Sequence, residues 1–202
     1  VSGHLQQARE FFSQAIEAAR RRDLKNAVAE LTAESGRWEA FLGDSPEACN
    51  HAKDALSGSR NWRVLLRTAM TLAKCGRMDE ALAIADEMSG QNRTSTYIQN
   101  IPLPILRAFI ELTRGNPAEA LRLVNQMQSR ASKVSLWPAY IAAEAYLHMG
   151  AEAEARAEFQ KIIEHRGIDP LSPVYPLAKL GLARALAASG QEEKGRKAYQ
   201  DF

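Results

Sequence analysis

Small and apolar residues recur along this chain at helical spacing and are interrupted at regular intervals by glycine. The stretch KCGRMDEALAIADEM (residues 74–88) is echoed by TRGNPAEALRLVNQM (113–127) and by HMGAEAEARAEFQKI (148–162). In each, glycine stands between two helical patterns, where its freedom to adopt positive φ ends one helix and turns the chain. Val, Ile and Thr show no sustained period-two alternation. The pattern therefore predicts an all-α chain of about eleven helices.

The residues around these glycines are small at two fixed distances. Six glycines align in this way: Gly3, Gly43, Gly76, Gly115, Gly150 and Gly190. Where the chain extends far enough, Ala or Gly stands seven residues before each and five residues after it, as in the pairs Ala69/Ala81, Ala108/Ala120, Ala143/Ala155, Gly36/Ala48 and Ala183/Gly195. These positions face each other across a helical hairpin, so small side chains let the two backbones approach closely. Four residues beyond the second small residue a larger residue continues the buried face in several units: Phe12, Val124, Phe159 and Tyr199.

Helix start signals agree with this alignment. Asn116-Pro117 provides a capping residue followed by proline at the first helical position, and Ser45-Pro46 and Ser172-Pro173 repeat the form. Pro102 and Pro104 should open or bend a helix. The sequence thus predicts one repeat domain over 1–202. It consists of a partial repeat (1–22) and five hairpins at about 23–58, 59–90, 94–131, 134–166 and 171–202.

Composition and charge narrow the classes of function. Lys and Arg total 26 against 24 Asp and Glu, a formal net charge of +2, which is too balanced to favour nucleic acid or an anionic membrane. No apolar run is long enough to span a bilayer. The four histidines show no metal-ligand spacing, and the chain lacks a nucleophile elbow, a phosphate-binding loop and a paired-carboxylate signature. We therefore expect no catalytic, cofactor-binding or metal-binding residues in this segment.

The glycine spacings of 40, 33, 39, 35 and 40 residues, together with the small-residue positions, resemble the tetratricopeptide repeat (TPR), which has a period of about 34 residues. The stretches NIPLPILRAFIELTRGNPAEALRLV and LAKLGLARALAASGQEEKGRKAYQDF are similar to the TPR region that follows the catalytic domain of certain bacterial serine/threonine protein kinases. The resemblance implies a right-handed superhelical solenoid of antiparallel helix pairs. No kinase motif is present. Both chain ends look like cuts in a longer protein, so this would be an accessory region.

In the TPR family the first helices of successive hairpins line a concave groove that takes an extended peptide or a partner helix. Counting back from each turn glycine places these residues in the lining: Arg63, Leu66, Met70, Ile105, Phe109, Leu112, Trp137, Tyr140, Glu144, Leu180 and Arg184. Aromatic anchors and Arg are the residue types that carry binding hot spots. The alternative is that Phe109, Trp137 and Tyr140 belong to the core.

Three further features carry structural expectations. Antiparallel stacking of the two helices should bring Cys49 and Cys75 near each other. The sequence allows either a disulfide or two free thiols there. Arg107 and Glu111, one turn apart at interior positions, are expected to form a buried ion pair, with a ligand contact as the alternative. At the C-terminal edge Phe202 should pack on another chain or on a bent segment, because the following hairpin is missing.

The resemblance gives three competing functions. The first is a protein-binding or sensory module of a serine/threonine kinase, extracytoplasmic if that kinase is membrane-anchored and otherwise cytoplasmic. The second is the ligand-responsive arm of a bacterial transcriptional regulator, since similar segments follow winged-helix domains. The third is a free-standing assembly scaffold. In all three we expect a protein or peptide partner, no nucleic acid and no membrane insertion by this segment.

Overall fold

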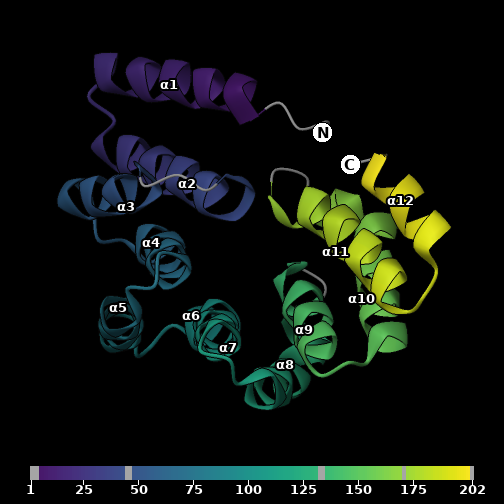
Figure 1. Ribbon diagram of the computed structural model, residues 1–202. Helices are drawn as coiled ribbons and strands as arrows, with labels where there is room; N and C mark the ends of the chain where they lie inside the picture. Colours follow the sequence, from purple (N-terminus) through teal and green to yellow (C-terminus); the bar gives the residue numbers. More distant parts are fainter. Residues whose placement is uncertain (1–4, 44–46, 132–134, 170–171, 201–202) are drawn as a thin grey trace. The chain divides into compact units, whose positions relative to one another are not determined.

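The computed structural model describes residues 5–43, 47–131, 135–169 and 172–200, and within them the chain is helical without strands (Figure 1). This confirms the all-α prediction. Eleven of the helices have nine residues or more. They are α1 (Leu5–Arg21), α2 (Lys25–Leu42), α3 (Glu47–Gly58), α4 (Trp62–Lys74), α5 (Met78–Gln91), α7 (Pro102–Thr113), α8 (Pro117–Ala131), α9 (Trp137–His148), α10 (Glu152–Glu164), α11 (Val174–Ala188) and α12 (Glu192–Gln200).

Two short elements complete this description. The five-residue helix α6 (Thr96–Asn100) precedes α7, and a 3-10 turn (Arg166–Ile168) follows α10. Helix α6 was not predicted as a separate element. It is capped by the Ser95 hydroxyl, which accepts from the Ile98 amide at 3.3 Å, and α7 begins at Pro102, as expected for proline at the first helical position.

The chain is divided into two compact units, and the boundary follows Leu106, inside α7. In the N-terminal unit α1, α3 and α4 each pack against α2, and α5 packs against α4. In the C-terminal unit α8, α9, α10, α11 and α12 pack successively, and α9 also contacts α11. A single repeat domain was expected from the sequence, and the boundary between the two units falls within its expected hairpin at 94–131.

The turn glycines follow the sequence pattern with one exception. Gly76, Gly115, Gly150 and Gly190 have φ between +71° and +84°, the left-handed conformation that ends a helix. Gly43 does not, because its φ is −132° and the chain leaves α2 in an extended conformation. The predicted left-handed turn at Gly43 is therefore wrong. Gly3, Ser45-Pro46 and Phe202, which also carried predictions, lie outside the described residues.

The small residues sit where helices meet. The six alanines of the three alanine pairs are completely buried. A Cβ added to Gly36 would lie 3.1 Å from the Ala48 carbonyl oxygen, and one added to Gly195 would lie 3.3 Å from that of Ala183. These distances are tighter than ordinary contact, so the predicted facing pairs bring two backbones together.

Larger apolar side chains fill the space around these contacts. Val124 and Phe159 are fully buried, whereas Tyr199 on α12 remains 43% exposed. The Phe159 ring lies against Gly181 on α11, where an added Cβ would come within 2.2 Å of the ring. In the N-terminal unit the fully buried side chains include Val64, Leu65 and Met70 of α4. Helix α4 thus supplies large side chains to a core that it shares with α2 and α3.

A disulfide joins Cys49 on α3 to Cys75, which follows the last residue of α4. The two Cα atoms are 6.4 Å apart and the bridge spans 26 residues of sequence. This resolves the choice between a bond and two free thiols that the sequence left open. The bridge fixes the end of α4 against α3 within the N-terminal unit.

We predict that replacing both cysteines by serine lowers the free energy of unfolding by about 3 kcal/mol, because a bridge over a loop of this length restricts the unfolded chain. Urea denaturation with and without a reducing agent measures the change. Reduction should shift the wild-type midpoint and leave that of the double variant unchanged. Equal wild-type midpoints in both conditions would contradict the prediction.

Candidate functional site

The predicted groove residues differ in burial. Seven of the eleven are buried: Met70, Ile105, Phe109, Leu112, Trp137, Tyr140 and Glu144. Arg63 and Arg184 are exposed, and Leu66 and Leu180 are half-buried. The burial of the three aromatic residues agrees with the alternative that they belong to the core. The accessible members of the predicted set are therefore Arg63 and Leu66 in one unit and Leu180 and Arg184 in the other.

In the C-terminal unit four aromatic rings form a continuous row. Phe109 on α7 meets Trp137 with ring centroids 6.0 Å apart, Trp137 meets Tyr140 at 5.7 Å, and Tyr140 meets Phe159 of α10 at 6.3 Å. The first two contacts are edge-to-face, an arrangement that aromatic quadrupoles favour. The row joins α9 to α7 through Trp137 and to α10 through Tyr140.

Tyr140 and Glu144 lie one turn apart on α9 and meet Arg184 from α11. The Arg184 guanidinium donates to the Glu144 carboxylate at 2.5 Å, where the Glu144 side chain is 9% exposed and that of Arg184 42%. Burial raises the pKa of the Tyr140 phenol far above its usual value, and the adjacent Glu144 carboxylate raises it further. Arg184 thus supplies the counter-charge for a buried carboxylate.

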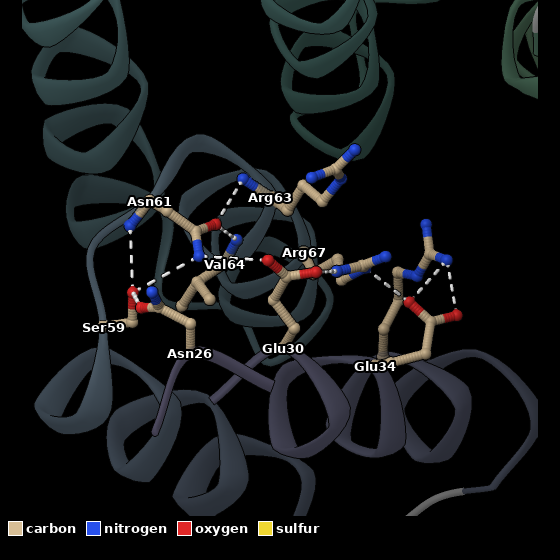
Figure 2. A network of polar contacts seen from close by, with 9 residues as sticks. Asn26, Glu30, Glu34, Ser59, Asn61, Arg63, Val64 and Arg67 are labelled. Atoms are coloured by element: carbon tan, nitrogen blue, oxygen red, sulfur yellow. Dashed lines mark hydrogen bonds and ion pairs between the residues drawn. The ribbon is translucent and has the colours of Figure 1, made fainter. Parts of the chain in front are cut away.

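In the N-terminal unit a denser polar network joins α2 to α4 (Figure 2). Both Glu34 carboxylate oxygens accept from Arg37, at 2.6 and 2.8 Å, and Glu34 also accepts from the Trp38 indole N–H at 3.0 Å. Arg67 on α4 lies 2.7 Å from Glu34 and 3.5 Å from Glu30. We call these residues (Glu30, Glu34, Arg37, Trp38 and Arg67) the Glu34 network.

The charge on Glu34 is maintained by its partners. Burial by itself would raise the pKa of this carboxyl group, but Arg37 and Arg67, with the hydrogen bonds from Arg37 and Trp38, outweigh it and hold the pKa below the usual value. Sequence analysis did not anticipate this network. The sequence does contain a signal for it: two acidic residues one turn apart, Glu30 and Glu34, and two basic residues one turn apart, Arg63 and Arg67. Of these four, only Arg63 carried a prediction, as a groove residue.

A partly exposed aromatic cluster, with Trp62 half-buried, lies at the beginning of α4. The Asn61 side chain caps this helix by accepting from the Arg63 and Val64 amides at 3.0 and 3.1 Å. The Arg63 guanidinium carbon lies 4.8 Å from the centroid of the Trp62 ring, and this ring meets Tyr97 of α6 edge-on at 5.8 Å. Tyr97 is 50% exposed. We call Trp62, Arg63 and Tyr97 the Trp62 patch.

The predicted interior ion pair between Arg107 and Glu111 is wrong. Glu111 instead accepts from Arg114 at 3.0 Å and from Asn116 at 2.7 Å, while Arg107 is exposed. Arg114 and Asn116 flank the turn at Gly115, so the turn brings two donors to Glu111 at the end of its own helix. Spacing alone made Glu111 a plausible partner for Arg107, because the two residues lie one helical turn apart.

Two further observations concern ions and membranes. Among the residues described by the structure, no group of three or more His, Cys, Asp and Glu side chains is placed to hold a metal ion. In the same part of the chain no helix is long and apolar enough to cross a membrane.

A scan against protein-family models, a search of curated proteins and a search of solved structures each found no match to this chain.

We predict that Glu34→Gln lowers the free energy of unfolding at neutral pH. The variant should also lose less of this free energy than wild type when the pH is lowered. Because the pKa of Glu34 is lowered in the folded state, its contribution is present above the unfolded-state pKa of about 4.3 and is lost as pH falls through the folded-state value. Breaking a buried charge pair costs about 3 kcal/mol. Urea denaturation between pH 7 and pH 3 measures both effects.

The matched control is Glu119→Gln, which removes an exposed carboxylate paired with Arg122 and should change stability little at any pH. Equal stability of Glu34→Gln and wild type at pH 7 would refute the predicted role of the Glu34 network.

Proposed function

We propose that this chain is a non-catalytic protein-interaction module built as a TPR-like, right-handed solenoid of antiparallel helix pairs. Six glycines in phase, four of them in the left-handed conformation, and the buried small residues that face each other across the hairpins support the repeat assignment. In a solenoid each hairpin contacts mainly its neighbours, and the remaining helix faces are free to bind. The absence of catalytic motifs from the sequence supports a binding role rather than chemistry.

The single observation that carries the binding role is the Trp62 patch. Trp, Tyr and Arg are the residue types most enriched at binding hot spots. Here all three are held together by ring and cation–π contacts, and the cap at Asn61 fixes the start of α4. A preordered patch loses little conformational entropy on binding, which favours affinity. The patch contains Arg63, one of the predicted groove residues, together with two aromatic neighbours.

The sequence resemblance supports placing this module in the accessory region of a bacterial serine/threonine protein kinase, where it would bind a peptide or a partner protein. The disulfide supports an extracytoplasmic location, since such bonds persist in oxidising compartments. That location is the one expected for a module attached to a membrane-anchored kinase.

The ligand-responsive arm of a transcriptional regulator is the second candidate. One observation favours it, a polar pocket between α1, α2 and α3. A signal-sensing arm needs such a pocket, whereas a free-standing scaffold does not.

Selection of peptides from a displayed random library tests the proposed binding surface. We expect the selected peptides to lose about thirtyfold in affinity towards Arg63→Ala and towards Tyr97→Ala, because truncation of a hot-spot residue costs about 2 kcal/mol. Arg93→Ala, an exposed arginine of the same unit, is the matched control and should bind normally.

Circular dichroism melting of each variant separates loss of binding from loss of folding. Selected peptides that bind wild type and both patch variants equally would overturn the assignment of the Trp62 patch, as would a library that yields no binder.

A further inference from the structure

A pocket of about 500 Å³ lies within the N-terminal unit, between α1, α2 and α3. Helices α1 and α3 both pack against α2, so α2 forms the floor and the other two form the walls. The wall residues from α1 are Ser13, Ile16, Glu17 and Arg20, whose spacing places them on one helix face. The volume falls in the range of small-molecule sites, about 300 to 1,000 Å³.

The floor carries two hydroxyl groups that the protein does not satisfy. Thr32 is 9% exposed and Ser35 is 6% exposed, and both line the pocket. Within the described residues neither side chain makes a hydrogen bond. By contrast, the Thr71 and Thr113 hydroxyls each donate to a carbonyl one turn earlier at 2.9 Å. Neither hydroxyl oxygen is among the fully enclosed unpartnered atoms of the described residues, so both are reachable from the pocket and can hydrogen-bond to a bound molecule.

The walls carry charges of both signs. Arg20 stands on the α1 wall with Glu17, and Asp54 stands on the α3 wall. Glu17 also lies 3.6 Å from Arg21, but both of these side chains are largely exposed. On the α3 wall, the Nδ1 atom of His51 lies 3.1 Å from the Glu39 carboxylate. The pocket thus offers a cation, two carboxylates and two hydroxyl groups around one space.

We propose that this pocket binds a small zwitterion with one ammonium and one carboxylate group, of the size of an amino acid or a dipeptide. The ligand carboxylate pairs with Arg20, and its ammonium group pairs with Glu17 or Asp54. Thr32 and Ser35 provide hydrogen bonds from the floor. An apolar ligand would leave these polar groups unpaired, which disfavours it. The site is independent of the Trp62 patch and of any protein partner.

Saturation-transfer NMR and calorimetry on the full chain test this proposal, with the twenty free L-amino acids and L-alanyl-L-alanine as probes. We expect at least one probe to bind, and the N-acetylated, C-amidated form of that probe to bind at least tenfold more weakly because it lacks both charges. Sorbitol, which offers hydroxyl groups only, should not bind.

Two variants locate the site. Arg20→Gln should weaken binding at least tenfold, whereas Arg22→Gln, two residues further along and outside the pocket lining, should not change it. Ser35→Leu should abolish binding by filling the floor, and its melting temperature shows whether it remains folded.

Four results would overturn the proposal. They are binding of none of the zwitterions, equal binding of the capped form, equal binding of sorbitol, and equal loss of affinity in Arg20→Gln and Arg22→Gln.

Discussion

Close approach of helix backbones at small residues is the constraint on which the rest of this structure depends. At Gly36 an added Cβ would lie 2.9 Å from the His51 Cβ atom and 3.1 Å from the Ala48 carbonyl oxygen. Such proximity holds α2 and α3 at a fixed separation and leaves little room for adjustment in a close-packed interior. Because α3 is fixed on α2, Cys49 reaches Cys75 at the end of α4, and the bridge then ties α4 to the same pair.

The functional features of the N-terminal unit are built on this frame. The Glu34 network joins α2 to α4 through buried charges, and the disulfide does so through α3. Helix α4 is thereby held at Arg67 in its middle and at its C-terminal end, and its first residues carry the Trp62 patch. Where α2 packs against α1 and α3, small residues of α2 leave a space that larger side chains would fill. This space is the polar pocket. In the C-terminal unit the aromatic row joins α9 to α7 and α10, and the Glu144–Arg184 pair joins α9 to α11.

The sequence predicted those features that depend on local spacing. Positive φ at four glycines, the buried alanine pairs and the helix start at Pro102 each follow from residue type and position within one hairpin. The predicted positive φ at Gly43 was wrong because α2 ends in an extended conformation, which glycine permits equally well.

The candidate sites were less accessible to sequence reasoning because they depend on which neighbour covers a helix face. Spacing placed Tyr140 and Glu144 on one face with Arg184 on a later helix, but it left the burial of Tyr140 open and did not predict that of Glu144. The Glu34 network and the contact between Trp62 and Tyr97 join separate helices, and α6 was not anticipated at all. Spacing alone paired Arg107 with Glu111. In the structure Glu111 instead accepts from two donors beside the turn at Gly115.

Comparison of Gly36→Ala with Gly90→Ala by urea denaturation tests the central constraint most directly. Gly90 also lies in a helix, but a Cβ there would meet nothing within 4 Å. Alanine is a better helix former than glycine by about 1 kcal/mol, so Gly90→Ala should match or exceed wild-type stability. Gly36→Ala should instead lower the free energy of unfolding by about 1 to 3 kcal/mol, because the added methyl group forces α2 and α3 apart. A Gly36→Ala protein as stable as Gly90→Ala would contradict the account.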